Sequence, residues 1–296
     1  MRISPSSCIL LFALALFTSM RPAPAQTLTG AIDIHAHSDP DGTPRSIDAI
    51  DLAKLAKSRG MRAIVLKNHY EPTASLAYIV RKEVPGIEVF GGISLDLTNG
   101  GVNPAAVEWM TKVKGGYGRV VWMPTFDSEH NAAPEHRPFA RVAKDGRLVP
   151  EVVQVIGIIA KHNLVLETGH SSPAEGLMLI REGKRQGVQN IVVTHAISRS
   201  VRMSIPEMQE AAKLGAFLEF VFVTPGSEEA KAHVKAIRAV GPEYCILASD
   251  LGQANKPLHP DGLLALYQYL RQQGFTEAEI DRMAKVNPAK VLGLKS

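Results

Sequence analysis

The chain has 296 residues, of which 45% are hydrophobic and 21% charged, and its formal net charge is +4. This length and apolar content are sufficient for one large domain with its own core. The sequence pI is near 9.0, but no basic run is interleaved with aromatic residues, so nucleic acid is not expected as a partner.

The first 25 residues have the pattern of a secretory signal peptide. A basic start at Arg2 is followed by an apolar run over 9–17 and by the small-residue sequence Ala-Pro-Ala at 23–25. The apolar run is shorter than the about 20 helical residues that cross a bilayer, which favours a cleaved leader over a membrane anchor. We therefore expect a periplasmic or secreted protein, with no membrane partner after cleavage.

Cleavage would leave a mature domain of residues 26–296 with 31 basic and 29 acidic side chains. Cys8 leaves with the leader, and Cys245 stays in an apolar run where a small buried side chain is expected. An intrachain disulfide is thereby excluded, so the core must supply the stability. The sequence leaves the oligomeric state open, including a homo-oligomer.

From residue 26 onward, short apolar runs rich in β-branched residues alternate with longer segments of helical period. This alternation predicts repeated βα units and a parallel sheet. Eight strands are expected, at 30–35, 63–67, 87–93, 119–123, 164–168, 190–194, 217–221 and 244–249. Eight strands close a barrel, and no glycine-rich phosphate loop follows the first run as in an open doubly wound sheet. The expected fold is a single-domain α/β protein, a (β/α)8 TIM-like barrel.

One connection, residues 125–149, is long and has no convincing period. It contains Asp127, His130 and Arg137. Loops of this length are uncommon in compact domains and are often lids or binding loops. We expect this segment to be a lid loop over the rim that follows the fourth strand, with Asp127 and His130 as substrate-binding residues.

The first strand ends in a His-x-His pair, His35 and His37. Residues two apart in a strand project from one face, which in a barrel strand is the interior. Two imidazoles held in this way suit zinc or a similar divalent ion. Asp33 is expected on the same face, either as an acceptor for the N–H of a metal-bound imidazole or as a further ligand.

Three more residues stand where later strands end. His170 follows the fifth run, His195 ends the sixth, and Asp250 follows the eighth. A barrel gathers the C-terminal ends of its strands at one rim, so these side chains are expected to meet the histidine pair of the first strand. The sequence therefore predicts a metal centre with one divalent ion per chain. Zinc is the first expectation, and manganese or iron are alternatives.

This set of residues resembles the pattern of the amidohydrolase superfamily of metal-dependent barrel hydrolases, and residues 287–294 look like the closing helix of that superfamily. In such enzymes the ion activates a water molecule and polarises the scissile carbonyl or phosphoryl group. By residue-to-residue correspondence, the resemblance implies the metal ligands His35, His37, His170 and His195, with Asp250 as both a ligand and the general base.

The chain departs from the binuclear members of the superfamily. Its fourth strand reads RVVWMPT and supplies neither a lysine nor a glutamate to bridge two ions. One ion is therefore the simpler expectation. Two residues leave a second ion possible. Lys67 ends the second strand and could bridge two ions if it is carboxylated, or could act as a catalytic cation. Glu167 is interpreted as a ligand or as a buried ion-pair partner.

Other polar residues near the rim have several interpretations. His69 has no place in the superfamily pattern and is interpreted as a catalytic residue that positions substrate, acts as an acid or adds a ligand. Arg45, in the loop after the first strand, could hold a substrate carboxylate, because a guanidinium group binds carboxylates through two hydrogen bonds. The partner expected at this rim is a small-molecule substrate.

The leading hypothesis for function is metal-dependent hydrolysis of an amide, lactone or related ester-like bond. Three alternatives remain. The first is metal-dependent decarboxylation within the same superfamily. The second is phosphoester hydrolysis, because residues 37–43 are similar to the opening motif of the polymerase and histidinol phosphatase family. The third is an exported, non-catalytic metal- or solute-binding protein, which would have no need of a carboxylate placed like Asp250.

Overall fold

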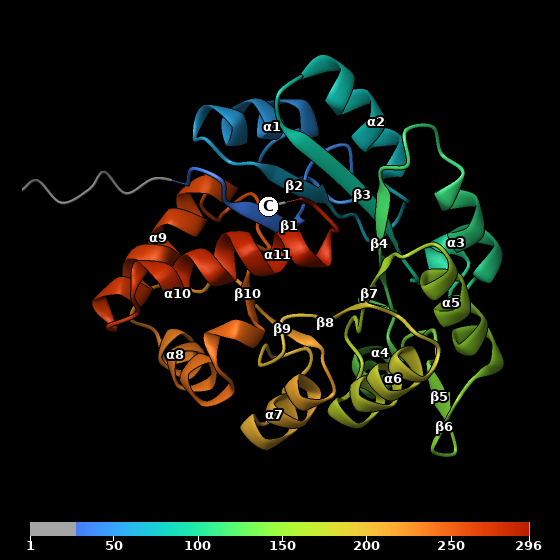
Figure 1. Cartoon of the computed structure of the whole chain (residues 1–296). Helices are drawn as coiled ribbons and strands as arrows, with labels where there is room; N and C mark the ends of the chain where they lie inside the picture. The colour runs from blue at the N-terminus through green and yellow to red at the C-terminus, as the bar shows by residue number, and fades with distance from the viewer. Residues whose placement is uncertain (1–27, 296) are drawn as a thin grey trace, which may run out of the picture.

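The structure, a computed structural model, describes residues 28–295. Eight parallel strands form a nearly closed barrel, and helices surround it (Figure 1). The expected (β/α)8 architecture is confirmed. The leader predicted at 1–25 lies outside the described residues. Within 28–295, no helix is long and apolar enough to cross a membrane.

The barrel strands follow one another around the sheet in chain order. They are β1 (Ile32–Ala36), β2 (Ala63–Leu66), β3 (Glu88–Ser94), β4 (Gly118–Trp122), β7 (Val165–Glu167), β8 (Asn190–Val193), β9 (Phe217–Phe220) and β10 (Cys245–Leu247). Each run that the sequence predicted as a strand therefore overlaps one of these strands, with bounds that differ by a residue or two. Every pairing between neighbouring strands is parallel.

Long helices connect the strands and cover the outside of the barrel. They are α1 (Ala49–Ser58), α2 (Ala74–Glu83), α3 (Pro104–Thr111), α5 (Pro150–Lys161), α6 (Pro173–Arg185), α7 (Ile205–Lys213), α8 (Glu228–Val240) and α9 (His259–Gln272). The shorter elements are η1 (Leu97–Asn99), α4 (Glu129–Ala132), η2 (Ala133–Glu135), β5 (Ala143–Lys144), β6 (Arg147–Leu148), η3 (Pro242–Tyr244), α10 (Glu277–Asp281), the π-helical turn η4 (Arg282–Val286) and α11 (Asn287–Val291).

The barrel closes between β1 and β10 just beyond the end of β10. Ala36 and Leu251 form a parallel bridge. The amide of Asp250 donates to the carbonyl of His35 at 2.8 Å, and the amide of His37 donates to the carbonyl of Leu251 at 2.9 Å. Because backbone hydrogen bonds join these two segments directly, the first and last predicted metal-ligating segments are held side by side.

The apolar core has two parts. The larger part lies between the strands and the outer helices, and the smaller part fills the barrel and includes Ile32, Ile34 and Trp122. Helix α11 contributes Val291 to the inner part and lies across β1 and β10 (Figure 1). Asn287 of α11 donates to the carbonyl of Cys245, where β10 begins, so α11 covers the barrel end opposite the rim.

A β-bulge changes which side chains of β1 face inward. The register with β2 shifts between Asp33 and Ala36. Ile34 packs in the barrel interior, and the shift also lets His35 face inward. Asp33 was expected to accept from an imidazole N–H on this face. It instead accepts from the backbone amides of Ser249 (2.9 Å) and His35 (3.1 Å).

The long connection after β4 contains several short elements of secondary structure. After the rim it forms α4 and η2, and the β5–β6 hairpin then packs against α6. The carbonyl of Asp127 accepts from the amide of Ala140 at 2.7 Å, which holds the two ends of this excursion together. Its beginning therefore lies at the rim and its hairpin lies at the side of the barrel. A role for it as a lid stays a prediction.

Candidate metal centre

Three of the predicted ligands bring one donor atom each to a single point. Asp250 Oδ1 lies 3.1 Å from His35 Nε2 and 3.2 Å from His37 Nε2. All three donor atoms lie within 4.8 Å of one another. Both histidines are buried, whereas the Asp250 side chain keeps 27% of its surface exposed. The group is therefore open to solvent on the aspartate side.

The spacing of these donors fits a divalent ion. Zinc bonds of about 2.0–2.2 Å in a tetrahedral site place neighbouring ligand atoms roughly 3.3 Å apart. The two contacts of Asp250 Oδ1, at 3.1 and 3.2 Å, are close to that separation. Two imidazole nitrogens and one carboxylate oxygen are also a common donor set for zinc, manganese and iron. The residues present thus fit an ion without rearrangement of the strands.

Glu219, on β9, lies behind His35 and was not among the residues predicted for the site. Its two carboxylate oxygens are both 3.2 Å from His35 Nδ1. It also accepts from the amide of His195 at 2.8 Å. A carboxylate on one ring nitrogen fixes the ring and leaves the other nitrogen for a metal. The sequence signal was present, since an acid in the apolar run FLEF two residues from the inward-facing Phe217 must also face inward.

His195 and His170 lie next to the three-donor group. The ring of His195 is stacked 5.8 Å from that of His35, and the ring of His170 is 4.9 Å from that of His195. Ser198 Oγ lies 2.7 Å from His195 Nδ1 and leaves Nε2 for other contacts. The structure therefore gathers all four histidines at one rim, as predicted. Metal ligation by His170 and His195 stays a prediction.

Two site residues adopt unusual backbone conformations. His195 has a φ of +24° and Asp250 a φ of +49°, a region that residues with a Cβ rarely adopt. Hydrogen bonds from their amides to Glu219 and to the carbonyl of His35 hold them there. Such strain persists only where the surroundings enforce it, and it is often found at functional sites.

Lys67 reaches the centre from the end of β2. Its Nζ lies 3.0 Å from His35 Nε2 and 5.6 Å from the centre of the Trp122 ring. Burial lowers the pKa of Lys67, although Asp250 and Glu219 oppose that shift. Lys67 is therefore a buried amine in direct contact with the predicted donors, which fits a catalytic or substrate-holding group.

Glu167, at the end of β7, is fully buried below the rim. Its Oε2 accepts from Thr194 Oγ1 at 2.7 Å, and its Oε1 has no hydrogen-bond partner among the described residues. Burial, with a further contribution from Glu219, raises the pKa of Glu167 well above its usual value. This carboxyl group accordingly favours the protonated form, and its role as a ligand stays a prediction.

The charges at the centre are strongly interdependent. Burial opposes ionisation of Asp250, but contact with His35 outweighs it and holds the pKa of Asp250 well below its usual value. Burial and Lys67 disfavour a charged His35, yet Asp250 and Glu219 outweigh them and raise its pKa to about 10. Burial instead lowers the pKa of His37 well below its usual value. Without an ion, the two neighbouring carboxylates thus favour a protonated His35.

A second polar network, which the sequence did not reveal, holds His69. Thr125 Oγ1 lies 2.7 Å from His69 Nδ1 and donates to Asp96 Oδ2 at 2.5 Å. Ser94 Oγ donates to the same carboxylate oxygen at 2.7 Å. The ring of His69 stacks on that of His37 at 4.9 Å. His69 therefore lies against the three-donor group and is held by a buried carboxylate through a hydroxyl.

Two aromatic side chains remain exposed beside these histidines. Phe126 is 45% exposed and Tyr70 is 36% exposed, and their rings are 4° from parallel with centres 6.4 Å apart. The Phe126 ring meets His69 edge-on at 4.2 Å and lies 6.3 Å from His170. An apolar surface thus borders the polar rim.

The three residues predicted to bind substrate take different positions. Arg45 Nε donates to Asp41 at 2.7 Å, so it is engaged in a local ion pair. Asp127 accepts from the amide of Leu97 at 3.0 Å. His130 lies in α4 and lines a hollow between the β5–β6 hairpin and the start of α6. Substrate binding by these residues stays a prediction.

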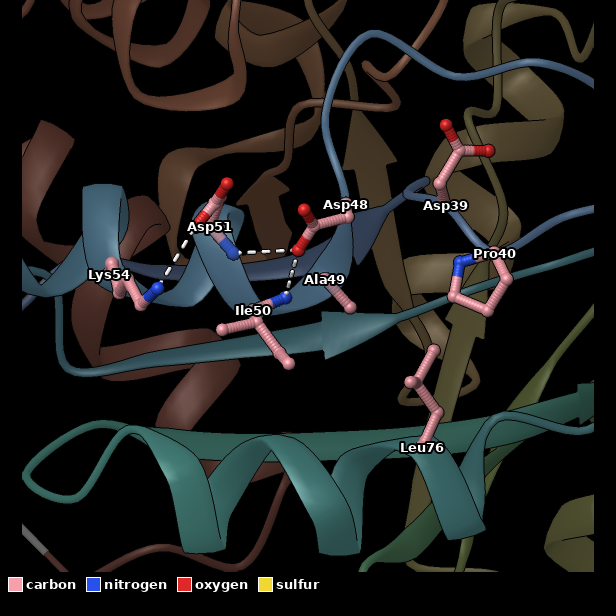
Figure 2. A pocket seen from close by; sticks show the side chains of 8 residues that line it. All are labelled: Asp39, Pro40, Asp48, Ala49, Ile50, Asp51, Lys54 and Leu76. Atoms are coloured by element: carbon pink, nitrogen blue, oxygen red, sulfur yellow. Dashed lines mark hydrogen bonds and ion pairs between the residues drawn. The ribbon is translucent and has the colours of Figure 1, made fainter.

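A separate cavity lies at the N-terminus of α1 (Figure 2). Asp48 caps this helix by accepting from the amides of Ile50 and Asp51, and Lys54 pairs with Asp51. Asp39 and Leu76 also line the cavity, and the histidines of the rim do not. Helix capping accounts for Asp48, and the ion pair accounts for Asp51 and Lys54.

Over residues 30–219 the sequence matches a family of unknown function, DUF6282. The chain belongs to this family. No curated protein matches the sequence. The family assignment therefore brings no activity with it, and the site must be interpreted from its own geometry.

Solved structures with a similar fold were found. An amidohydrolase from Pseudomonas aeruginosa is 13% identical, with a TM-score of 0.64 over 89% of this chain and 95% of that one. A 2,6-dihydroxybenzoate decarboxylase from Rhizobium is 12% identical, with a TM-score of 0.60 over 90% and 99%. A zinc-bound amidohydrolase from Burkholderia multivorans gives the same four values. The expected resemblance to the amidohydrolase superfamily is confirmed at the level of the fold.

Proposed function

We propose that this chain is a metal-dependent hydrolase that adds water to an amide, lactone or related ester-like bond of a small molecule. One observation carries the proposal. Asp250 Oδ1 meets His35 Nε2 and His37 Nε2 at separations suited to one shared ion, and Glu219 orients His35 from behind. A divalent ion held there would lower the pKa of a water molecule and, as a Lewis acid, would polarise a carbonyl oxygen.

The residues of the chain have separable roles in this proposal. Asp250 is partly exposed, and its low pKa keeps it ionised at neutral pH, so in this proposal its free carboxylate is the group that takes the proton of the attacking water. His37 and His35 would hold the ion, and Glu219 orients His35 from behind. Lys67 and His69 border the donors and contact the substrate, where the Lys67 amine can stabilise developing negative charge.

Decarboxylation is the second candidate. The buried Lys67 amine beside the donors would attract a substrate carboxylate, and the structural neighbours include a decarboxylase. This reaction does not require a base to deprotonate water. Replacement of Asp250 therefore separates the two candidates, provided that the ion is retained.

The test is to purify the mature chain, measure its content of zinc, manganese and iron, and assay ester, lactone, amide, phosphoester and aromatic carboxylate panels. Asp250→Asn keeps the shape of the side chain and removes its basicity. We expect it to lower hydrolytic turnover about 100-fold or more, the usual contribution of a general base. Retention of both metal and full hydrolytic activity would contradict the base assignment. Stoichiometric metal with no turnover of any panel member would favour the binding-protein alternative.

We also propose that the protein is exported, because residues 1–25 have the composition of a cleaved leader. Expression of the full chain in a Gram-negative host, followed by fractionation and N-terminal sequencing, tests this. A periplasmic product that begins near residue 26 is expected. An uncleaved cytoplasmic product would contradict export.

A further inference from the structure

The exposed rings at the rim are held rigidly. Asp96 Oδ1 accepts from the amide of Thr125 at 2.8 Å and from that of Asp127 at 3.0 Å, so both neighbours of Phe126 are fixed by one buried carboxylate. Tyr70 packs against the loop that follows β1, where a Cβ on Gly42 would lie 3.0 Å from its ring. The backbone that carries Phe126 is therefore fixed, and the Tyr70 ring is in close contact with the loop after β1.

Their position relative to the polar groups is also specific. Phe126 touches His69, and His69 stacks on His37, a residue of the three-donor group. A molecule whose reactive bond is at the donors must therefore extend past these rings. Rigid exposed aromatic side chains beside a few convergent polar groups are typical of a small-molecule site.

We propose that Phe126 and Tyr70 bind a planar ring of the substrate, so that the substrate class is an aromatic or heteroaromatic carbonyl compound. This inference rests on the proposed function for the placement of the reactive carbonyl at the donors. The ring site itself consists of Phe126, Tyr70 and the edge of His69. A saturated ring of the same size presents no flat face and therefore makes poorer contact with this ring site.

The test compares benzamide with cyclohexanecarboxamide, two uncharged probes with the same amide group and the same ring size. Binding is measured by ligand-observed NMR titration, with both the zinc-loaded and the metal-free mature chain. We expect benzamide to bind more tightly in both forms. Phe126→Ala should weaken benzamide binding about two- to tenfold, the usual value of an aromatic contact, and should leave the weaker probe nearly unchanged.

Two further variants control this comparison. Phe126→Leu keeps an apolar side chain without a flat face and should also lose the preference. Trp109→Ala removes a 68% exposed aromatic residue of α3 and should change nothing. Equal binding of the two probes, no detectable benzamide binding, or a preference that survives Phe126→Ala would overturn the ring site.

Metal content separates failure of this inference from failure of the proposed function. A chain that holds zinc but lacks the preference retains the proposed function and loses the ring site. A metal-free chain that shows the preference but never acquires zinc retains the ring site and loses the proposed function.

A different observation, the hydrogen-bond chain behind His69, carries a second inference. The hydroxyl groups of Thr125 and Ser94 both donate to Oδ2 of Asp96. The single hydroxyl proton of Thr125 is thus committed, and its oxygen accepts from His69 Nδ1. The geometry points to Asp96 and Thr125 as positioning residues that fix the His69 ring in the tautomer with its proton on Nδ1. His69 Nε2 then offers a lone pair, as an acceptor or ligand and not as a donor.

The test is ¹⁵N NMR of the His69 ring in the metal-free chain at neutral pH, assigned by comparison with His69→Gln. The shifts of protonated and unprotonated ring nitrogens are widely separated, so the tautomer is read directly. Wild type is expected to show protonated Nδ1, Thr125→Ser to retain it, and Thr125→Val to give a mixture. Protonated Nε2 in wild type, or an unchanged tautomer in Thr125→Val, would overturn the assignment.

Discussion

Glu219 and His35 form a carboxylate–imidazole pair across the barrel, with both carboxylate oxygens 3.2 Å from Nδ1. Both side chains are fully buried, so solvent does not weaken the contact. The pair turns His35 Nε2 towards Asp250. A carboxylate of β9 therefore decides the orientation of the first predicted ligand on β1.

The first prediction concerns this pair. Glu219→Gln keeps the shape of the side chain but removes its charge, and loss of such a support usually weakens metal binding about 10- to 100-fold. We expect that loss in a competition titration against a chromophoric chelator. Replacement of Glu228, an exposed acid of α8, by Gln is the matched control and should not change the affinity. An unchanged affinity in Glu219→Gln would remove Glu219 from the metal centre.

The second prediction concerns the buried amine. Lys67 Nζ is 3.0 Å from His35 Nε2, and a positive charge at that distance opposes a divalent ion. Lys67→Met should therefore raise the affinity for zinc about tenfold or more, whereas Lys54→Met, on the exposed face of α1, should not. A fall in affinity, with loss of a carboxylation adduct in the mass spectrum, would instead show that Lys67 is a carboxylated ligand.

The third prediction concerns pH. His259 is buried, with its Nε2 donating to the carbonyl of His37 at 2.9 Å, and burial lowers its pKa to about 4. The unfolded chain binds this proton below about pH 6.5, and the folded chain binds it only below about pH 4. The free energy of unfolding should therefore fall as the pH drops from about 6.5 to 4, by about 3 kcal/mol from this residue.

His259→Gln retains a donor for the carbonyl of His37 but does not titrate. Its unfolding free energy, measured by urea denaturation of the metal-free chain, should depend less steeply on pH in this window. A slope equal to that of the wild type would contradict the assignment.

The fourth prediction concerns the loop that carries His170. Gly169 has a φ of +62°, and a Cβ there would lie 2.2 Å from the carbonyl oxygen of Met123. Gly169→Ala should lower the free energy of unfolding by about 2 kcal/mol or more, because backbone strain and a clash with backbone combine. Gly187→Ala is the control, since its φ is +84° but no atom lies within 4 Å of the added Cβ. It should cost about 1 kcal/mol from the backbone alone. Equal losses in the two variants would show that the clash is relieved.

Much of the architecture could be predicted from local patterns. Inward-facing apolar residues two apart recur in several strands, such as Ile32 and Ile34 or Val120 and Trp122, and turns separate the strands from helices with capping residues. The capping box of Ser172 with Glu175 is formed as its sequence indicates. These features depend on neighbours within a few residues, so they can be predicted from the sequence alone.

The candidate site was predictable where it follows strand ends. His35, His37 and Asp250 do converge, because parallel strands that close a barrel deliver their C-terminal ends to one rim. Asp33 was misplaced, because simple alternation cannot anticipate the bulge that follows it in β1. A bulge depends on pairing with another strand and leaves no period in the sequence.

The sequence by itself determined the number of strands and placed the four histidines and Asp250 at their ends, since both depend on local periodicity. Only the tertiary structure decided that Glu219 supports His35, that Lys67 touches the same imidazole, and that Asp96 holds both His69 and the loop of Phe126. These pairs are far apart in the chain. Barrel closure and strand register set their separations, and a hydrogen bond forms only when those separations are correct to within a few tenths of an ångström.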